Sequence, residues 1–180
     1  MNVLVPIANG SESLETVAIV NVLRRAGITV TLASIENTLT VSGTRELKLT
    51  ADAFLKDVAA REWNAIVLPG GLPGAEALGK HAPLIERLRQ QRDAGKLYGG
   101  ICAAPAIALA GNGLLDGKRA TGYPGIDGIT QRVDESVVVD GNCITSQGPG
   151  TAIALGLKLA ELLVGAAKSK EVARTMLAVA

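Results

Sequence analysis

The chain has 180 residues, of which 48% are hydrophobic and 19% charged, and its formal net charge is +1. A chain of this length folds most economically as one unit, so residues 1–180 are expected to form a single domain. A nearly neutral surface provides no field that attracts nucleic acid or an anionic membrane, and the few aromatic residues are too few for a base-stacking platform. We therefore expect neither nucleic-acid binding nor membrane association.

The two cysteines and the first residues bear on the cellular compartment. Cys102 and Cys143 both lie in apolar, strand-like segments, so a disulfide framework is not suggested. No Lys or Arg precedes Arg24, which leaves no basic region typical of a signal peptide. The longest apolar stretch, around residues 101–110, is too short to span a bilayer. These features predict a cytoplasmic protein.

The beginning of the chain alternates between strand and helix patterns. Residues 2–8 form an apolar run that Asn9-Gly10 closes, as in a buried strand. Apolar residues recur at helical spacing over 14–23, and a second strand is expected at 29–33. A strand, a helix and a strand in this order predict the βαβ unit of a parallel sheet.

The same alternation continues to the end of the chain. The Pro69-Gly70-Gly71 segment is interpreted as a turn, and Asp140-Gly141 as the turn of a hairpin. The further elements expected, in order, are hairpin-like strands at 39–41 and 46–49, a strand at 65–68, a helix at 83–94, a strand at 96–101, a helix at 105–110, strands at 137–139 and 143–146, and helices at 151–164 and 168–179. This pattern predicts an α/β sandwich with a largely parallel sheet.

Ligands of such sheets bind beyond the carboxyl ends of the strands. The segments expected there are 9–12, 69–71, 102–103 and 146–150. The sequence therefore predicts that these loops surround one site.

Cys102 is the strongest candidate for reactive chemistry. It lies where a strand passes into a helix, with small residues two positions before and after it, Gly100 and Ala104. This is the spacing of a nucleophile elbow, where bulky neighbours would clash. The N–H groups at the start of the following helix would favour thiolate over thiol. We interpret Cys102 as a reactive thiolate, and Cys143, inside a strand, as a core residue.

The groups that assist this thiol are expected to be acids. The only histidine, His81, is interpreted as a solvated loop residue, so neither a Cys-His-Glu triad nor a metal site is expected. Glu12 and Glu15 lie in the first turn of a helix, where the helix dipole alone favours negative charge. Glu15 also falls near the end of the first strand, where burial beside a thiolate would raise its pKa and let it donate or shuttle a proton. Spacing alone leaves both interpretations of Glu15 open.

The glycine-rich segment 69–74 is a weaker signal. It matches neither a dinucleotide-binding nor a P-loop pattern. Its N–H groups could pair with that of Ala103 to hold a developing oxyanion.

Five stretches of the chain resemble the ThiJ/PfpI superfamily, in the branch of the parkinsonism-associated deglycase and its bacterial YajL-like members. They run in the family's order over nearly the whole chain, at residues 10–16, 24–28, 67–71, 101–105 and 145–151. The resemblance implies a flavodoxin-like three-layer α/β sandwich, similar to class I glutamine amidotransferases, that is usually a homodimer and uses no cofactor.

The resemblance also implies roles for individual residues. The family's nucleophilic, oxidation-sensitive cysteine would be Cys102, and its protonated glutamate would be Glu15. The backbone amides of Gly71 and Ala103 match the oxyanion-binding positions. Two arginines match residues near the family's site and dimer interface, Arg25 and, from the neighbouring subunit, Arg45.

The activity implied is glyoxalase or deglycase action, of the lyase or hydrolase type, on methylglyoxal-like dicarbonyls or their early adducts, in protection against carbonyl and oxidative stress. The alternative is a non-enzymatic redox sensor or stress chaperone that uses oxidation of the same cysteine. One departure concerns Tyr123, which stands where some members carry histidine in a His-Pro pair. A phenol cannot relay protons near neutral pH as imidazole does. This leaves Glu15 as the expected acid/base and weighs against protease activity.

Overall fold

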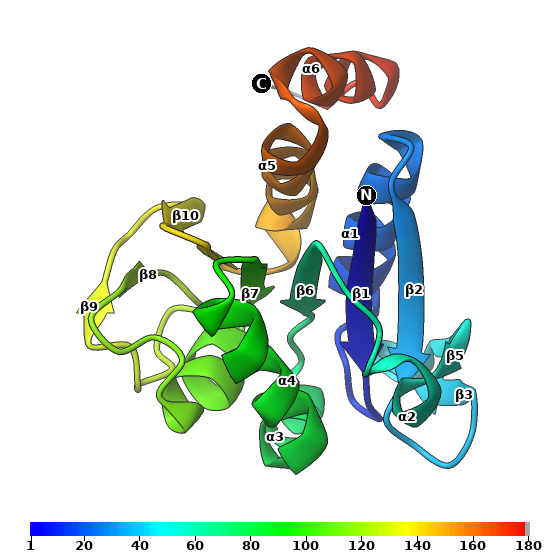
Figure 1. Ribbon diagram of the computed structural model, residues 1–180, viewed down its shortest axis with the longest axis vertical. Helices are drawn as coiled ribbons and strands as arrows, with labels where there is room; N and C mark the ends of the chain where they lie inside the picture. Colours follow the sequence, from blue (N-terminus) through cyan, green and yellow to red (C-terminus); the bar gives the residue numbers. More distant parts are fainter. Residues whose placement is uncertain (179–180) are drawn as a thin grey trace.

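A single seven-stranded sheet forms the centre of the computed structural model, which describes residues 1–178 (Figure 1). The strand order is β10-β11-β7-β6-β1-β2-β5, and every pairing is parallel except that between β10 and β11. The strands are β1 (Asn2–Ile7), β2 (Thr29–Ser34), β5 (Ala53–Phe54), β6 (Ala65–Leu68), β7 (Leu97–Ile101), β10 (Val137–Asp140) and β11 (Cys143–Ser146). Taken in chain order, the five inner strands follow the 2-1-3-4-5 order of flavodoxin-like folds.

Helices cover both faces of this sheet, so its central strands are apolar along their whole length. The helices are α1 (Ser13–Arg25), α2 (Leu55–Val58), α3 (Leu72–Lys80), α4 (Ala82–Asp93), α5 (Ala152–Val164) and α6 (Ala166–Thr175). Helix α1 packs against α5, and α5 against α6, whereas α3 packs against α4. In Figure 1, α4 lies in front of the sheet and α1 behind it. The predicted flavodoxin-like sandwich is confirmed.

Three local predictions need correction. The break predicted at Pro69-Gly70-Gly71 is present, but the helix α3 that follows it was not predicted; α3 tolerates Pro73 in its first turn because a proline there loses no helical hydrogen bond. The helix predicted at 105–110 is present, but it has π-type hydrogen bonds over Pro105–Leu109 and is followed by a short 3-10 turn. The last helix ends at Thr175, before the predicted 179, and residue 179 lies outside the described residues.

The predicted hairpin-like insertion forms its own two-stranded sheet, β3 (Thr40–Ser42) with β4 (Lys48–Thr50). Its second strand begins later than predicted because Arg45 and Glu46 have positive φ angles of 56° and 61°. A further small parallel sheet pairs β8 (Arg119–Ala120) with β9 (Gln131–Arg132).

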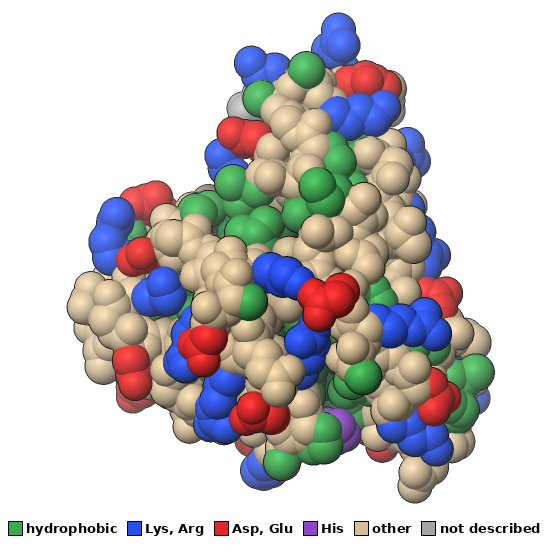
Figure 2. Space-filling view, in the orientation of Figure 1, with side chains coloured by type: hydrophobic (Ala, Val, Ile, Leu, Met, Phe, Trp, Pro, Cys, Tyr) green, Lys and Arg blue, Asp and Glu red, His purple; other side chains and the backbone are tan. Residues whose placement is uncertain are grey.

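The surface carries charges of both signs. On the face shown in Figure 2, Lys and Arg side chains are interspersed with Asp and Glu. Of the helices that the structure describes, none has the length and apolar character needed to cross a membrane.

Candidate active site

The backbone of Cys102 adopts a left-handed conformation immediately after β7. Its φ angle is 63°, a region that costs an L-residue about 1–2 kcal/mol. Two hydrogen bonds hold this conformation: the Cys102 N–H donates to the Ser146 carbonyl (3.0 Å), and the Tyr123 N–H donates to the Cys102 carbonyl (2.8 Å). Strained backbone of this kind persists where the surroundings over-determine it, which is common at active sites.

Small neighbours make this sharp turn possible. A Cβ atom built on Gly100 would lie 3.1 Å from the Cβ of Ala104 and 3.3 Å from the Leu68 carbonyl oxygen. Larger side chains at these two positions would therefore collide. The strand-turn-helix context expected of a nucleophile elbow is present at Cys102.

Glu15 reaches the thiol from the first turn of α1. Its side chain is fully buried, and its Oε2 accepts a hydrogen bond from the Gly70 N–H at 2.7 Å. Its Oε1 has no hydrogen-bond partner among the described residues, and the carboxyl group lies close enough to the Cys102 thiol for each group to shift the pKa of the other. Burial raises the pKa of Glu15 to about 7, although the Gly70 N–H opposes the shift. Glu15 therefore titrates in the range where a carboxyl can act as a base at neutral pH.

Gly70 is a site residue that the sequence analysis named only as part of a turn. A Cβ on this residue would lie 2.8 Å from Oε2 of Glu15 and closer still to the Cβ of Cys102. Only glycine lets the backbone approach both groups. The signal for it was a pair of glycines directly after a buried strand, at the edge of the sheet where ligands bind.

The thiol itself differs from the sequence expectation. Burial, and next the negative charge of Glu15, raise the pKa of Cys102 to about 12, whereas the sequence analysis expected helix N–H groups to lower it. The chain is helical from Ala104 onward, with π-type hydrogen bonds over Pro105–Leu109, and Cys102 is only 9% exposed. Burial and the negative charge of Glu15 thus favour the thiol form of Cys102 over the thiolate.

Two backbone N–H groups lie beside the sulfur. Those of Gly71 and Ala103 oppose the rise in the pKa of Cys102. Gly71 has φ 79°, and a Cβ there would collide with the Gly10 carbonyl oxygen. These are the two groups expected to bind an oxyanion, and the structure brings both to Cys102.

Two surface hollows meet at Cys102 and share Tyr123. The first, of about 350 Å³, is here called the apolar hollow; it is lined by Leu72, Cys102, Ala103, Tyr123, Pro124, Gly125 and Ile126. The second, of about 440 Å³, is called the charged hollow; it is lined by Gly10, Glu12, Thr44, Arg45, Pro73, Cys102, Tyr123 and Pro149. Tyr123 is 47% exposed, so its ring stands at the surface between the two hollows.

Arg45 lines the charged hollow of its own chain. Its predicted place near the site of a neighbouring subunit stays a prediction. The β3–β4 hairpin carries Arg45 to the hollow because Thr44 is tied to the start of α1. The Thr44 hydroxyl donates to Glu12 at 2.9 Å and accepts from the Ser13 N–H at 3.2 Å. Glu12 in turn caps α1 by accepting from the Glu15 N–H at 2.7 Å, so the helix-end interpretation holds for Glu12.

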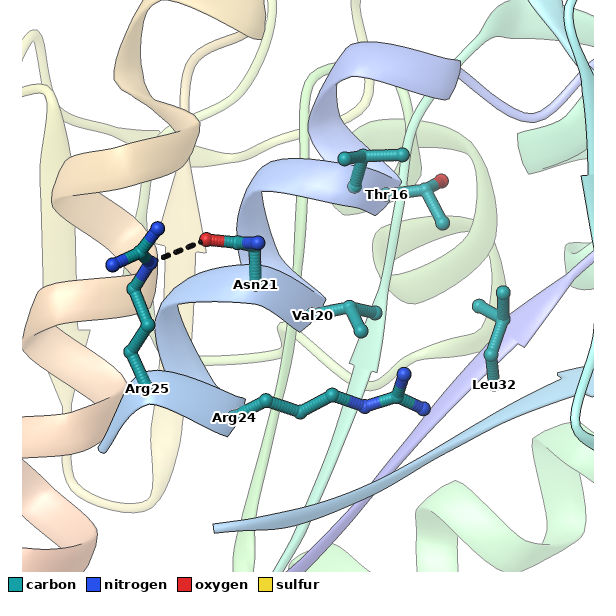
Figure 3. Close-up of a pocket in the computed structure, with 7 residues that line it drawn as sticks. Thr16, Val20, Asn21, Arg24, Arg25 and Leu32 are labelled. Carbon is teal, nitrogen blue, oxygen red and sulfur yellow. Dashed lines mark hydrogen bonds between the residues drawn. The ribbon is translucent and has the colours of Figure 1, made fainter. Parts of the chain in front are cut away.

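Arg25 is not brought to the thiol. It donates to Asn21 within α1 at 2.8 Å and leaves the helix on the side opposite Arg24 (Figure 3). Both arginines line a separate hollow of about 490 Å³ along α1. Thr16 and Leu32 also line this hollow, which shares no lining residue with the two hollows at Cys102. Arg25 therefore lies on the outer surface of α1.

The remaining candidates lie elsewhere. His81 is not simply a loop residue, because its Nδ1 accepts the Leu84 N–H at 3.2 Å and caps α4. Cys143 is 1% exposed inside β11, where burial raises its pKa to about 11. Within residues 1–178, no group of three or more His, Cys, Asp or Glu side chains could hold a metal ion.

Comparisons with known proteins show which family the chain resembles in sequence and in fold. DJ-1 homolog A of Arabidopsis thaliana is 44% identical over 178 residues, which cover 97% of this chain and 45% of that protein. The chain thus spans less than half the length of this relative. The solved structure of oxidized DJ-1 from Toxoplasma gondii superposes with a TM-score of 0.96 at 38% identity, and 99% of each chain is covered.

A third relative carries an activity in its name. The "Glutathione-independent glyoxalase DJR-1.2" of Caenorhabditis elegans is 32% identical over 170 residues, covering 92% of this chain and 90% of that protein. The model of the DJ-1/PfpI family matches residues 1–162. The family predicted from the sequence is therefore confirmed: the chain belongs to the DJ-1/PfpI family, in its DJ-1 branch.

Proposed function

We propose that the chain is a cysteine-dependent, cofactor-free glyoxalase or deglycase that acts on methylglyoxal-like dicarbonyls or their early adducts. The observation that carries this proposal is the close approach of Cys102 and the buried Glu15 to each other at Gly70, with the N–H groups of Gly71 and Ala103 beside the sulfur. The name of the nematode relative, a glyoxalase that needs no glutathione, supports the same reaction.

In the first step, the Cys102 sulfur adds to the aldehyde carbon of R–CO–CHO. The carboxylate of Glu15 takes the thiol proton as the S–C bond forms, and the π electrons of the C=O bond move to the oxygen. The N–H groups of Gly71 and Ala103 stabilise this oxyanion. Return of the proton to the oxygen gives a hemithioacetal and restores the Glu15 carboxylate.

In the second step, Glu15 moves a proton between the two former carbonyl carbons. It removes the C–H proton of the hemithioacetal, and the resulting enediol takes a proton at the neighbouring carbon to give a thioester. Water then hydrolyses the thioester, which releases R–CH(OH)–COOH and restores the thiol. The net reaction adds one water and involves no external oxidant or reductant.

The test is conversion of methylglyoxal to lactate without glutathione or added metal, followed by proton NMR. We expect turnover by the wild type and its loss in Cys102→Ala. Lactate formation that is unchanged in Cys102→Ala would refute the mechanism.

The alternative function is a redox sensor or stress chaperone that uses oxidation of Cys102. The observation in its favour is that the same N–H groups would stabilise a sulfinate on Cys102. Low doses of peroxide followed by intact-mass analysis separate the two: a sensor gains two oxygens on Cys102 before any other residue reacts. If Cys143 reacts first, the sensor is ruled out.

We also propose that the protein is a cytoplasmic homodimer. Both cysteines are free, as in a reducing compartment. Leu14 and Val17 on α1 and Leu47 on the hairpin are more than half exposed, and two copies could bury them against each other. Sedimentation analysis is expected to give a dimer for the wild type and a monomer for Val17→Glu. A monomeric wild type at micromolar concentration would contradict this proposal.

A further inference from the structure

The two hollows at Cys102 differ in chemistry, although both open onto the same sulfur. Among the described residues that line the apolar hollow, none is charged, and Leu72 and Ile126 supply aliphatic walls. The charged hollow contains Arg45 and Glu12, whose hydration would be lost if an apolar group were placed there. The sulfur therefore lies at a boundary between an apolar and a charged environment.

This boundary distinguishes the two ends of a dicarbonyl. In R–CO–CHO, the aldehyde carbon bonds to sulfur, and the substituent R must lie on one side or the other. An apolar R is favoured in the apolar hollow, because burial there removes hydrocarbon from water without desolvating a charge. Ala103, whose N–H lies beside the sulfur, lines the same hollow.

The volume of the apolar hollow also favours a bulky apolar R group there. The apolar hollow has a volume of about 350 Å³, within the usual range for small-molecule sites. A methyl group fills only a small part of it, whereas a phenyl or branched alkyl group contacts both Leu72 and Ile126.

We propose that the apolar hollow is a substituent-binding site that makes 2-oxoaldehydes with a bulky apolar R group better substrates than methylglyoxal. This inference rests on the proposed function, and Leu72 and Ile126 are its specificity-determining residues. Leu72 is 51% exposed at the start of α3, so its side chain is available to a substrate.

The test measures kcat/KM for glyoxal, methylglyoxal and phenylglyoxal in the wild type, Leu72→Ala and Ile126→Ala. Dividing each variant by the wild type cancels the intrinsic reactivity of the aldehydes. We expect the two variants to lose about tenfold with phenylglyoxal, mostly in KM, and less than twofold with glyoxal. Leu162→Ala is the matched control, because Leu162 is 43% exposed on α5, away from both hollows. Equal losses for all three aldehydes would overturn the proposal.

A second readout needs no turnover. Cys102 is alkylated with iodoacetamide and with its N-benzyl derivative, and the modified peptide is quantified by mass spectrometry. We expect the benzyl reagent to react faster in the wild type and to lose this advantage in Leu72→Ala. If the benzyl reagent reacts faster but the protein turns over no dicarbonyl, the proposed function is refuted and the apolar hollow is supported as a binding site. If the protein turns over dicarbonyls but neither reacts faster with the benzyl reagent nor prefers phenylglyoxal, only the role of the apolar hollow is refuted.

Discussion

Cys143 lies in β11 and Cys102 directly after the neighbouring strand β7, and the two cysteines differ in almost everything except burial. Cys143 pairs with Tyr98 across β11 and β7, while Cys102 follows the end of β7. Burial raises both thiol pKa values, to about 11 and about 12. What separates them is position: Cys102 adjoins a carboxyl group and two open hollows, whereas Cys143 is enclosed in the sheet beside the Tyr98 hydroxyl. The thiol pKa therefore does not distinguish Cys102 from Cys143. Cys102 is distinguished by a nearby base and by access to substrate.

The largest expected effect comes from replacing each cysteine in turn. Cys102→Ala should reduce kcat/KM for a dicarbonyl by about 10³-fold or more, because the S–C bond can no longer form. Cys143→Ala should retain activity within about threefold and lose stability instead, since it opens a small cavity in the core. Steady-state kinetics and thermal unfolding measure the two effects. Comparable losses of kcat/KM in both variants would contradict the different roles assigned to the two cysteines.

The next effect tests the base. Glu15→Gln keeps the size of the side chain and removes its titration, so kcat/KM should fall by about 10²–10⁴-fold. Activity of the wild type should rise with pH through about 7, as Glu15 becomes a carboxylate that can accept the thiol proton. The residual activity of Glu15→Gln should lack this rise. A step near pH 7 that survives in the variant would assign the titration to another group.

Gly70→Ala should disturb the pair without changing either member. The added Cβ has no room between Cys102 and Glu15, and overpacking of this kind costs about 1–3 kcal/mol. We expect the free energy of unfolding to fall by this amount and kcat/KM to fall as well. Gly150→Ala is the control, since a Cβ there meets nothing within 4 Å and its φ is not positive. Equal behaviour of the two variants would show that the close approach at Gly70 is unimportant.

The last expected effect is the dependence of stability on pH. Glu15 has a raised pKa in the folded protein, so the folded state binds more protons than the unfolded state between pH 4.5 and about 7. Its contribution to stability is full below pH 4.5 and is lost as pH rises through 7, by about 3 kcal/mol. Denaturant unfolding at pH 5 and pH 8 should show this loss in the wild type and not in Glu15→Gln. A wild type at least as stable at pH 8 would contradict the raised pKa.

Much of the fold was predictable because its signals are local. Apolar runs and helical spacing gave the βαβ start, the hairpin at Asp140-Gly141 and the parallel sheet. Helix α3 was missed because Gly71, Pro73 and Gly74 are typical of turns; in the structure it packs against the π-helical segment Pro105–Leu109 and against α4. The helix predicted after Cys102 is present, but its sequence did not reveal that the hydrogen bonds over Pro105–Leu109 are of the π type.

The candidate site was predictable in its members and not in its electrostatics. Small residues around Cys102 and the position of Glu15 pointed to the pair. The direction of the thiol pKa was wrong, because burial beside a carboxyl group depends on how α1, β6 and β7 pack and not on spacing along the chain. The contributions of Gly70, Leu72 and the chain's own Arg45 likewise come from loops that meet only in three dimensions.

The left-handed backbone at Cys102 has a consequence for how this protein can change over time. Glycine is the residue that this conformation tolerates best, so the fold would be relieved of strain if the nucleophile were lost. Stability and reactivity are opposed at this one position. Mutation of residue 102 can therefore give a more stable but inactive protein, and only selection for the chemistry of the thiol can keep a cysteine there.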